Sequence, residues 1–471
     1  MTMDTNLVSA AQYHRRTKHQ LARFAAGPET LDWDAQPSPF RTWAGAPLIH
    51  LPLVADHLAT TWAELDSVDG VSPHELDLRA LACLLELSFG LTAWKQFGPD
   101  RWALRANPSS GNLHPTEAYV LARGVQGLAD GLYHYEPLQH ALVCRALYEA
   151  AGDAEQGCGH GLWIGLSAIQ WREAWKYGER AFRYCELDAG HALGAVRYAA
   201  AALGWQARRL DGLCHAELSV CMGLDRDADF GVAEREEAAM LIAVGPALAL
   251  GASPLFKRTG WYGQASRLDP RPMYKWPVID AVSESTRVMR APDVPSPDSI
   301  LPPYSQPHLK EGGEQRPSAR QSEPAASLIR GRRSAQHFDR QAQMPEACFT
   351  TIIRALLPAH QLPWDAWPWA PRVHGIFYVY RVDGVEPGVY VLPRSERGEA
   401  MLRHEIKAAS TWVLARSLMR DDQGHDWPLW RVAEHPGLPG ALRQLSCHQA
   451  IASDACWSMS MVAEFDGALG E

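Results

Sequence analysis

The sequence predicts an α+β protein built from two tandem units. Strand and helix patterns follow one another without the strict alternation of a parallel α/β sheet. A proline-rich stretch interrupts the chain, and a similar hairpin pattern occurs on each side of it. The 471 residues are enough for two or three domains. We expect an N-terminal extension over 1–70, a first domain over 71–290, a linker over 291–326 and a second domain over 327–471.

Both halves contain a helix pattern followed by a hairpin pattern. Residues 119–137 read YVLARGVQGLADGLYHYEP and residues 377–394 read FYVYRVDGVEPGVYVLPR, each a strand, a turn and a second strand. Apolar residues spaced by three and four precede each hairpin and predict an amphipathic helix. These residues are Leu78, Leu81, Leu84, Leu85 and Phe89 in the first half, and Phe349, Ile352, Ile353, Leu356 and Leu357 in the second. We interpret the pattern as a duplication with a degenerate second copy.

A long helix and a buried strand are expected later in the first half. The stretch from Asp188 and His191 to Leu203 carries a stripe of small apolar residues, and Gly204 is a plausible helix stop. Asp188 and His191 are expected to cap and pack this helix. Residues 239–246 read as a buried strand. No counterpart of this helix and strand follows in the second half, so the second copy is expected to be incomplete.

Composition excludes several classes of protein. Apolar residues make up 46% and charged residues 21%, as in ordinary globular proteins. The net charge of -9 argues against a nucleic-acid partner. No apolar run is long enough to span a membrane, and no apolar signal core opens the chain. Nine cysteines lie scattered without CxxC spacing, so we expect a cytoplasmic protein with reduced thiols and no metal site.

The strongest local signal is the stretch RANPSSGNLHP, residues 105–115. Its proline and glycine favour an irregular loop, and common nucleotide-binding fingerprints are absent from the chain. Hydroxyl, amide and imidazole groups together with a guanidinium suit a polyhydroxylated, phosphorylated ligand. The candidate ligands are Arg105, Pro108, Ser109, Ser110, Asn112 and His114. An ordinary Ser/Asn turn before a strand is the alternative.

At this point the chain resembles a known family. PSSGNLHPTEAYV resembles the P-S-S-x-N-x-Q-P signature of the nitroreductase-like flavin enzymes, with His114 where Gln is usual. The stretch WKYGERAFRYCELDAGH (175–191) is similar to a motif of SagB/ThcOx-type peptide dehydrogenases within that superfamily. The resemblance spans residues 13–290.

The resemblance implies an FMN-dependent fold with a mixed or antiparallel sheet flanked by helices. In this family an R-R-S motif binds the flavin phosphate opposite the P-S-S-x-N loop of another subunit. Here that motif is Arg332-Arg333-Ser334, in the second half, although Gln336 replaces the last Arg of the family pattern. We therefore expect one composite FMN site in an intrachain pseudo-dimer, or in a homodimer. Arg15 and Arg16 are rival ligands of the phosphate.

Lys176 and Tyr177 are the predicted catalytic residues. In azoline-oxidising relatives a Lys-Tyr pair is associated with catalysis, and a desolvated lysine suits proton removal. An amphipathic segment with exposed charges is the alternative. The second half carries Cys447-His448-Gln449 where we expect the counterpart of this region, so its own chemistry is expected to be lost.

Three functions remain open at this stage. The first is an FMN-dependent dehydrogenase that converts azolines to azoles in a ribosomally made peptide, with a cyclodehydratase as partner. The second is an NAD(P)H-dependent nitroreductase or quinone reductase acting on small molecules. The third is a scaffold without flavin in a peptide-maturation complex.

Overall fold

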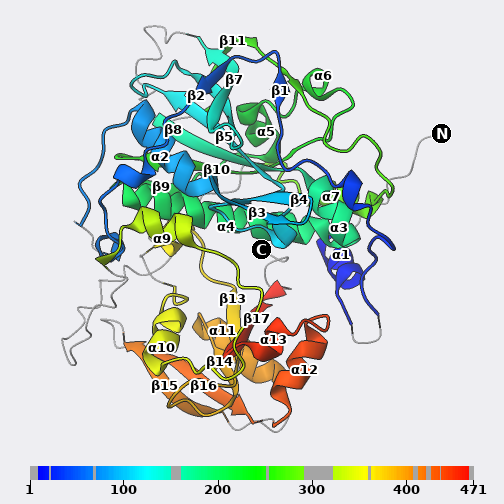
Figure 1. Ribbon diagram of the computed structural model, residues 1–471, viewed down its shortest axis with the longest axis vertical. Coiled ribbons are helices and arrows are strands. Elements are labelled where there is room, and N and C mark those ends of the chain that lie inside the picture. The colour runs from blue at the N-terminus through cyan, green and yellow to red at the C-terminus, as the bar shows by residue number, and fades with distance from the viewer. Residues whose placement is uncertain are drawn as a thin grey trace. The chain divides into compact units, whose positions relative to one another are not determined.

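The computed structural model describes residues 9–20, 23–66, 70–149, 161–250, 254–290, 322–358, 362–406, 412–420, 426–434 and 436–465 (Figure 1). The chain divides into two compact units, each with its own sheet. The first unit contains Met1–Val294, Arg316–Arg332 and Gln361–Trp367, and the second contains Pro295–Gln315, Arg333–His360 and Pro368–Glu471. Thus one segment that begins within the expected linker region and one that follows it both belong to the first unit.

An eight-stranded sheet forms the centre of the first unit. Seven strands follow the order β11-β7-β6-β5-β8-β10-β9, β2 pairs with β7, and every pairing is antiparallel. The strands are β2 (Leu48–His50), β5 (Thr116–Arg123), β6 (Gly131–Glu136), β7 (Ala141–Tyr148), β8 (Gly161–Ala168), β9 (Gln206–Arg209), β10 (Glu237–Gly245) and β11 (Arg258–Trp261).

The two faces of this sheet carry separate cores. Side chains alternate along a strand, so Ala118 and Val120 of β5 join one cluster while Tyr119 and Leu121 join the other. Both faces are covered, and β5 and β8 are therefore buried along their whole length. The predicted hairpin and the predicted strand over 239–246 are confirmed.

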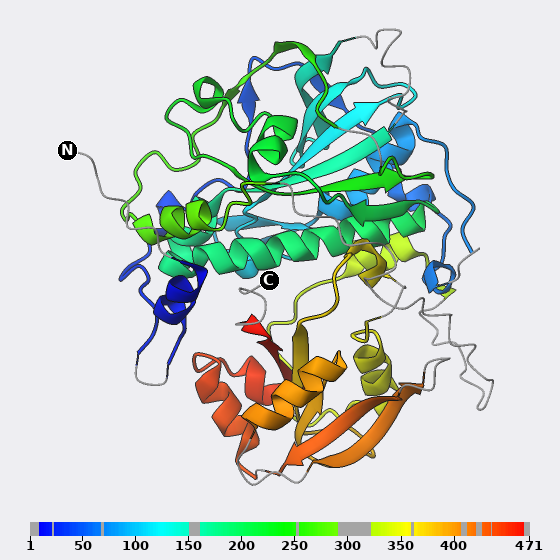
Figure 2. The ribbon, with the colours of Figure 1, turned by 180° about the vertical axis from the view of Figure 1, so that it is seen from behind.

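Helices α2 (Leu78–Phe89) and α4 (Ala181–Ala202) cover one face of the sheet, and Figure 2 shows α4 running along it. Asp77 begins α2 by accepting a hydrogen bond from the Ala80 backbone N–H at 2.7 Å. The predicted helix over the first apolar stripe is confirmed. The long helix is also confirmed, but it begins before Asp188, so that residue lies within α4 and does not cap it.

The remaining elements of the first unit surround these layers. Helix α3 follows β8 directly, and a 3-10 turn (Gly178–Arg180) separates it from α4. A two-stranded hairpin, β3 and β4, leads into the loop 106–115. The elements are α1 (Ala10–Thr17), β1 (Trp43–Ala44), β3 (Leu91–Phe97), β4 (Asp100–Arg105), α3 (Gln170–Tyr177), α5 (His215–Met222), α6 (Asp227–Phe230), β12 (Gln264–Ala265), α7 (Pro277–Ser285) and α9 (Ala325–Gly331).

Two distant segments complete the first unit. In α9, the backbone N–H of Ala325 donates to the carbonyl of Thr60 at 2.8 Å, and Ala325 joins the core beneath α2. Asp365 accepts a hydrogen bond from Arg197 of α4 at 2.6 Å. These contacts explain why both segments belong to this unit.

The second unit has a five-stranded antiparallel sheet in the order β15-β16-β14-β13-β17. Phe349 and Ile353 of α10 pack with Phe377 and Trp457 in its core, so the second predicted helix and hairpin are confirmed. Its elements are α10 (Glu346–Arg354), β13 (Val373–Val379), β14 (Gly388–Leu392), α11 (Glu396–Glu405), β15 (Val413–Arg420), β16 (Asp426–Ala433), α12 (Leu438–Leu445), α13 (Ile451–Asp454) and β17 (Trp457–Ala463). Among the described residues of both units, no helix is long and apolar enough to cross a membrane.

The topology corrects one prediction. In the first unit the Lys-Tyr helix follows β8, the strand that pairs with the first strand of the hairpin. In the second unit the strand in that position is β17. Cys447-His448-Gln449 lies between α12 and α13, before β17, and so does not occupy the position of Lys176 and Tyr177.

Candidate active site

The loop between β4 and β5 is held in its shape by its own side chains. Gly111, Asn112 and His114 have backbone φ angles of 60°, 61° and 52°. Ser109 Oγ accepts a hydrogen bond from the His114 backbone N–H at 2.8 Å, and Asn112 Nδ2 donates to the Ala103 carbonyl at 3.0 Å. Asn112 Oδ1 lies 3.2 Å from His114 Nε2. Most polar groups expected to bind a ligand thus also stabilise an unusual backbone conformation.

Asp188 anchors this loop to α4. Its Oδ1 accepts hydrogen bonds from the Ser110 backbone N–H at 3.0 Å and from Ser110 Oγ at 2.8 Å. The aspartate is buried, so these charge-assisted bonds are shielded from water. His191, which the sequence places beside Asp188, is exposed.

The same loop contacts Tyr177. A Cβ on Gly111 would lie 2.5 Å from the tyrosine Oη, so only glycine leaves room for the ring. Burial first, and then the charges of Glu173 and Asp188, raise the pKa of Tyr177. Lys176 is half-buried, with its Nζ 5.5 Å from the centre of the Tyr177 ring and 5.7 Å from that of Trp33.

Arg105 and His114 lie beneath the loop. Arg105 donates to the carbonyl of Pro39 and lies 5.5 Å from the centre of the Phe40 ring; burial lowers its pKa to about 10. Burial, with the charges of Arg105 and Arg172, holds the pKa of His114 well below its usual range. His114 is therefore a neutral imidazole. The guanidinium of Arg105 is inaccessible to solvent, and its role as an anion ligand stays a prediction.

A buried ion pair supports the floor of the site. Arg172 of α3 donates to the His114 carbonyl at 2.7 Å and to the carboxylate of Glu117, which also contacts His134 at 2.6 Å. Burial opposes ionisation of Glu117, but Arg172 and His134 outweigh it and lower the pKa to about 2. Glu117 was not among the predicted ligands, and its role here is to fix α3 against the loop.

Glu173 was missed by the sequence reasoning. It is completely buried on α3, one helical turn before Lys176 and Tyr177, and neither carboxyl oxygen has a hydrogen-bond partner within the described part of the chain. Burial, reinforced by the charge of Asp188, raises its pKa to about 9. The only sequence signal was its helical spacing from the Lys-Tyr pair, because glutamate is common on exposed helix faces.

The predicted phosphate ligands are placed as follows. Arg332, Arg333 and Ser334 are exposed and directly follow α9, with Arg332 in the first unit and the other two in the second. Their role as phosphate ligands, and with it the composite site, stays a prediction. Arg15 is exposed, while Arg16 pairs with Glu179 at 2.5 Å.

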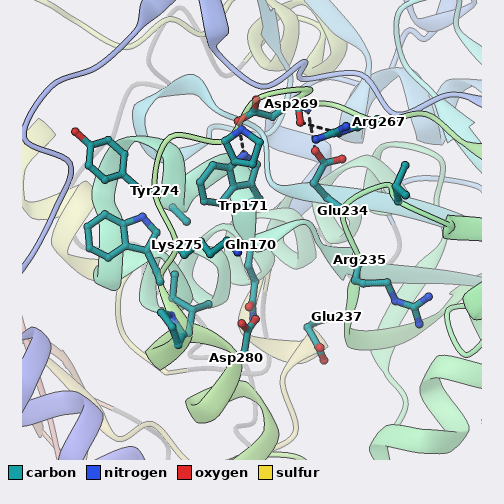
Figure 3. Close-up of a pocket in the computed structure, with 16 residues that line it drawn as sticks. Gln170, Trp171, Glu234, Arg235, Glu237, Arg267, Asp269, Tyr274, Lys275 and Asp280 are labelled. Atoms are coloured by element: carbon teal, nitrogen blue, oxygen red, sulfur yellow. Dashed lines mark hydrogen bonds between the residues drawn. The ribbon is translucent and has the colours of Figure 1, made fainter. Parts of the chain in front are cut away.

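A cavity of about 410 Å³ lies beside α3 (Figure 3). Trp171 Nε1 donates to Asp269 at 2.8 Å on one wall, and the rings of Tyr274 and Trp276 stack 5.8 Å apart. The figure also shows several charged side chains along the walls. The charged lining residues are Glu234, Arg235, Glu237, Arg267, Asp269, Lys275 and Asp280. No group of side chains within the described residues has the arrangement of a metal site.

Comparison with known proteins identifies the fold. A scan against protein-family models finds no match. This chain is similar to the crystal structure of a "putative nitroreductase" from Anabaena variabilis, with a TM-score of 0.61 and 20% sequence identity. The match covers 98% of this chain and 86% of the Anabaena variabilis chain. The chain therefore has a nitroreductase-like fold, with mixed helices and antiparallel sheets.

A second relative matches by sequence. A "putative nitroreductase" of Methanocaldococcus jannaschii is 31% identical over 137 residues, which is 27% of this chain. The match spans 65% of the relative's length. The Escherichia coli microcin synthetase complex with a truncated microcin precursor also matches, over 51% of this chain, but its TM-score of 0.29 is too low to indicate a common fold.

The loop retains groups that suit a flavin. Ser109 Oγ accepts one bond within the loop and keeps its own proton to donate, and Ser110 Oγ keeps lone pairs free to accept. Asn112 and His114 are already engaged with each other and contribute less. The two serines next to the Lys-Tyr pair are therefore the best candidates to hold a cofactor that carries hydroxyl and ring-nitrogen groups.

Proposed function

We propose that this chain is an FMN-dependent oxidoreductase that dehydrogenates azoline rings to azoles in a ribosomally made peptide. The main observation behind this proposal is that the P-S-S-G-N loop contacts Tyr177 of the Lys176-Tyr177 pair. Tyr177 contacts Gly111, and Asp188 ties Ser110 to the helix that follows. The nitroreductase-like fold supports this reading, and both the structural and the sequence relative are named as putative nitroreductases.

The residues divide the chemistry between them. FMN, when bound, supplies the acceptor for the hydride that leaves the azoline ring. The ring also loses a proton, and Lys176 and Tyr177 are the groups proposed to remove it. Ser109 and Ser110 would hold the cofactor, with Pro108 and Asn112 shaping the loop. Arg332, Arg333 and Ser334, or alternatively Arg15 and Arg16, would bind its phosphate.

Lys176 is proposed to act on the substrate. It is half-buried between two aromatic rings, so its ammonium form gains cation–π contact while its amine remains accessible at the surface.

The second unit is proposed to be a degenerate copy of the first. In both units the first hairpin strand pairs with a later strand, which is β8 in the first unit and β17 in the second. The second hairpin strand pairs on its other side with β7 in the first unit and with β16 in the second. Tyr133 donates to the carbonyl of Ala129 at 2.8 Å, and Tyr390 donates to that of Glu386 at 2.6 Å. The same bond four residues back, at the same place in both hairpins, supports a common origin.

The test is a dehydrogenation assay with the purified, flavin-reconstituted full chain. A thiazoline-containing peptide is incubated in air, so that oxygen takes up the electrons, and loss of two hydrogens is followed by mass spectrometry. Lys176→Ala and Tyr177→Phe should each slow conversion about 10²-fold or more. Lys257→Ala, at an exposed lysine, is the matched control. Absence of conversion by protein that does bind flavin would exclude azoline oxidation.

The second candidate is an NAD(P)H-dependent nitroreductase or quinone reductase. The Methanocaldococcus jannaschii relative favours it, because that protein is named as a nitroreductase. The same preparation is mixed with NADPH and a nitroaromatic compound. Rapid NADPH oxidation together with inert thiazoline peptide would replace the first function by this one. Binding to a cyclodehydratase or a leader peptide is a further part of the first proposal and is checked by pull-down with those partners.

A further inference from the structure

Glu173 is an unusual residue for the interior of a protein. Its side chain is completely buried, and both carboxyl oxygens lack a hydrogen-bond partner within the described residues. A buried carboxyl group without partners costs several kcal/mol less when it is neutral than when it is charged, so it retains its proton. Such an isolated group in a well-packed structure calls for a functional explanation.

Its position relative to the Lys-Tyr pair suggests that function. Lys176 and Tyr177 lie three and four residues after Glu173 on α3, the spacings at which helix side chains meet. Besides burial, two charges shift the pKa of Glu173: Asp188 on α4 raises it, and Lys176 on the same helix lowers it. The charge of Glu173 in turn helps to raise the pKa of Tyr177 on α3 and that of Cys185 on α4.

The remaining charged neighbour, Arg172 of α3, is already committed to Glu117. Asp188 is committed to Ser110, from which it accepts two hydrogen bonds. A second carboxylate beside it would be strongly disfavoured. The loop anchor and the burial of α3 therefore both act to keep Glu173 neutral.

We infer that Glu173 is a positioning residue of the proposed dehydrogenase, which keeps Lys176 free of a carboxylate partner for as long as it holds its proton. The effect on catalysis rests on the proposed function, whereas the protonation of Glu173 does not. With Glu173 neutral, Lys176 has no ion pair with the residue one helical turn before it. If Glu173 ionised, it would pair with Lys176 and repel Asp188, which would loosen the Ser110 anchor.

The protonation state can be measured without flavin or substrate. Infrared difference spectra of the purified full chain, recorded against Glu173→Gln, should contain the carbonyl band of a buried, protonated carboxylic acid at neutral pH. The band should disappear as the pH rises through about 9, the pKa of Glu173. Glu284→Gln, at an exposed position of α7, removes a glutamate of ordinary surroundings and should leave the band in place. A spectrum at neutral pH without such a band would overturn the inference.

The consequence for catalysis is read from pH profiles of flavin-loaded protein. Above about pH 9 the wild-type rate should fall about tenfold for each pH unit, because a single ionisation removes the active form. Glu173→Gln copies the neutral acid, so it should retain the neutral-pH rate and lose this alkaline fall. A residue needed only for packing would leave the profile unchanged in shape. An alkaline fall that persists in Glu173→Gln would contradict the assigned role even if the infrared band is found.

The two proposals fail in distinguishable ways. If the protein turns over no azoline, the proposed function fails, while the infrared titration still decides whether Glu173 holds a proton. If Glu173→Gln does not fold, as judged by circular dichroism, the band is titrated in wild-type protein labelled with ¹³C-glutamate. If no labelled carboxylic-acid band persists at neutral pH and disappears near pH 9, the inference is overturned.

Discussion

Gly111 shows how a single residue links the loop to the predicted catalytic pair. Its φ of 60° lies in the left-handed region, and an added Cβ would lie 2.5 Å from Tyr177 Oη and 3.1 Å from the ring. Gly111→Ala should therefore displace Tyr177 and destabilise the fold by about 1–2 kcal/mol. Thermal unfolding measures the loss of stability, and turnover of a thiazoline peptide measures the effect of displacing Tyr177.

Gly190 provides the matched control. It lies within α4, and a Cβ there would meet nothing within 4 Å. Gly190→Ala should be neutral or should stabilise the protein by up to about 1 kcal/mol, because alanine favours a helix. Equal destabilisation by both substitutions would show that the contact with Tyr177 is unimportant.

At the same scale, the sequence indicated the chemistry of the loop better than its geometry. The pattern of Ser109, Ser110 and Asn112 predicted a binding loop, and the structure brings it next to Tyr177 and Asp188. It did not predict that Asn112 would bond within its own loop, since any amide has several possible partners. The roles of these residues as ligands stay predictions.

At the scale of elements, helix α1 holds the turn that follows the Lys-Tyr pair. Tyr13 donates to the Glu179 carbonyl at 2.6 Å, and Arg16 binds the Glu179 carboxylate through Nε and Nη2 at 2.8 and 2.5 Å. The Glu179 side chain is only 7% exposed, so loss of Arg16 leaves a nearly buried charge unpaired. Arg16→Ala should lower the free energy of unfolding by about 1–2 kcal/mol.

Arg15 is the control for this helix. It is exposed on the same turn, so Arg15→Ala should change stability by less than about 0.5 kcal/mol. Urea unfolding of both variants measures the difference. A stable Arg16→Ala protein that has lost flavin would instead support the rival assignment of Arg16 to the phosphate.

Elements with a clear periodic pattern could be predicted, and those defined by distant contacts could not. The apolar stripes that became α2 and α10 are regular, and the strands of both hairpins are bounded by turn residues. By contrast, the start of α4 depends on a turn at Gly178, whose backbone passes close to Ala26 and Gly27. The assignment of α9 to the first unit depends on Thr60, far away in the sequence.

At the scale of the whole molecule, the question is how many flavins one chain holds. The P-S-S-G-N loop and the Lys-Tyr pair occur once, in the first unit. The second unit reaches its hairpin through Pro368–Arg372, a stretch without serine or asparagine. Each chain should therefore bind about one FMN, measured from the visible absorbance and the flavin released per chain.

The identity of the phosphate ligands decides whether that single site needs Arg332 and Arg333. An FMN phosphate carries nearly two negative charges, and loss of two arginines that contact it should cost at least about 3 kcal/mol, or about 10²-fold in affinity. We expect Arg332→Ala combined with Arg333→Ala to lose flavin to this degree, and Arg15→Ala to retain it. Fluorescence titration of the apoprotein with FMN measures both dissociation constants. Full affinity in the double variant would assign the phosphate to other residues of this chain or to a second copy of the chain. Two flavins per chain would show that the second unit has kept a site of its own, because the first unit contains only one such loop.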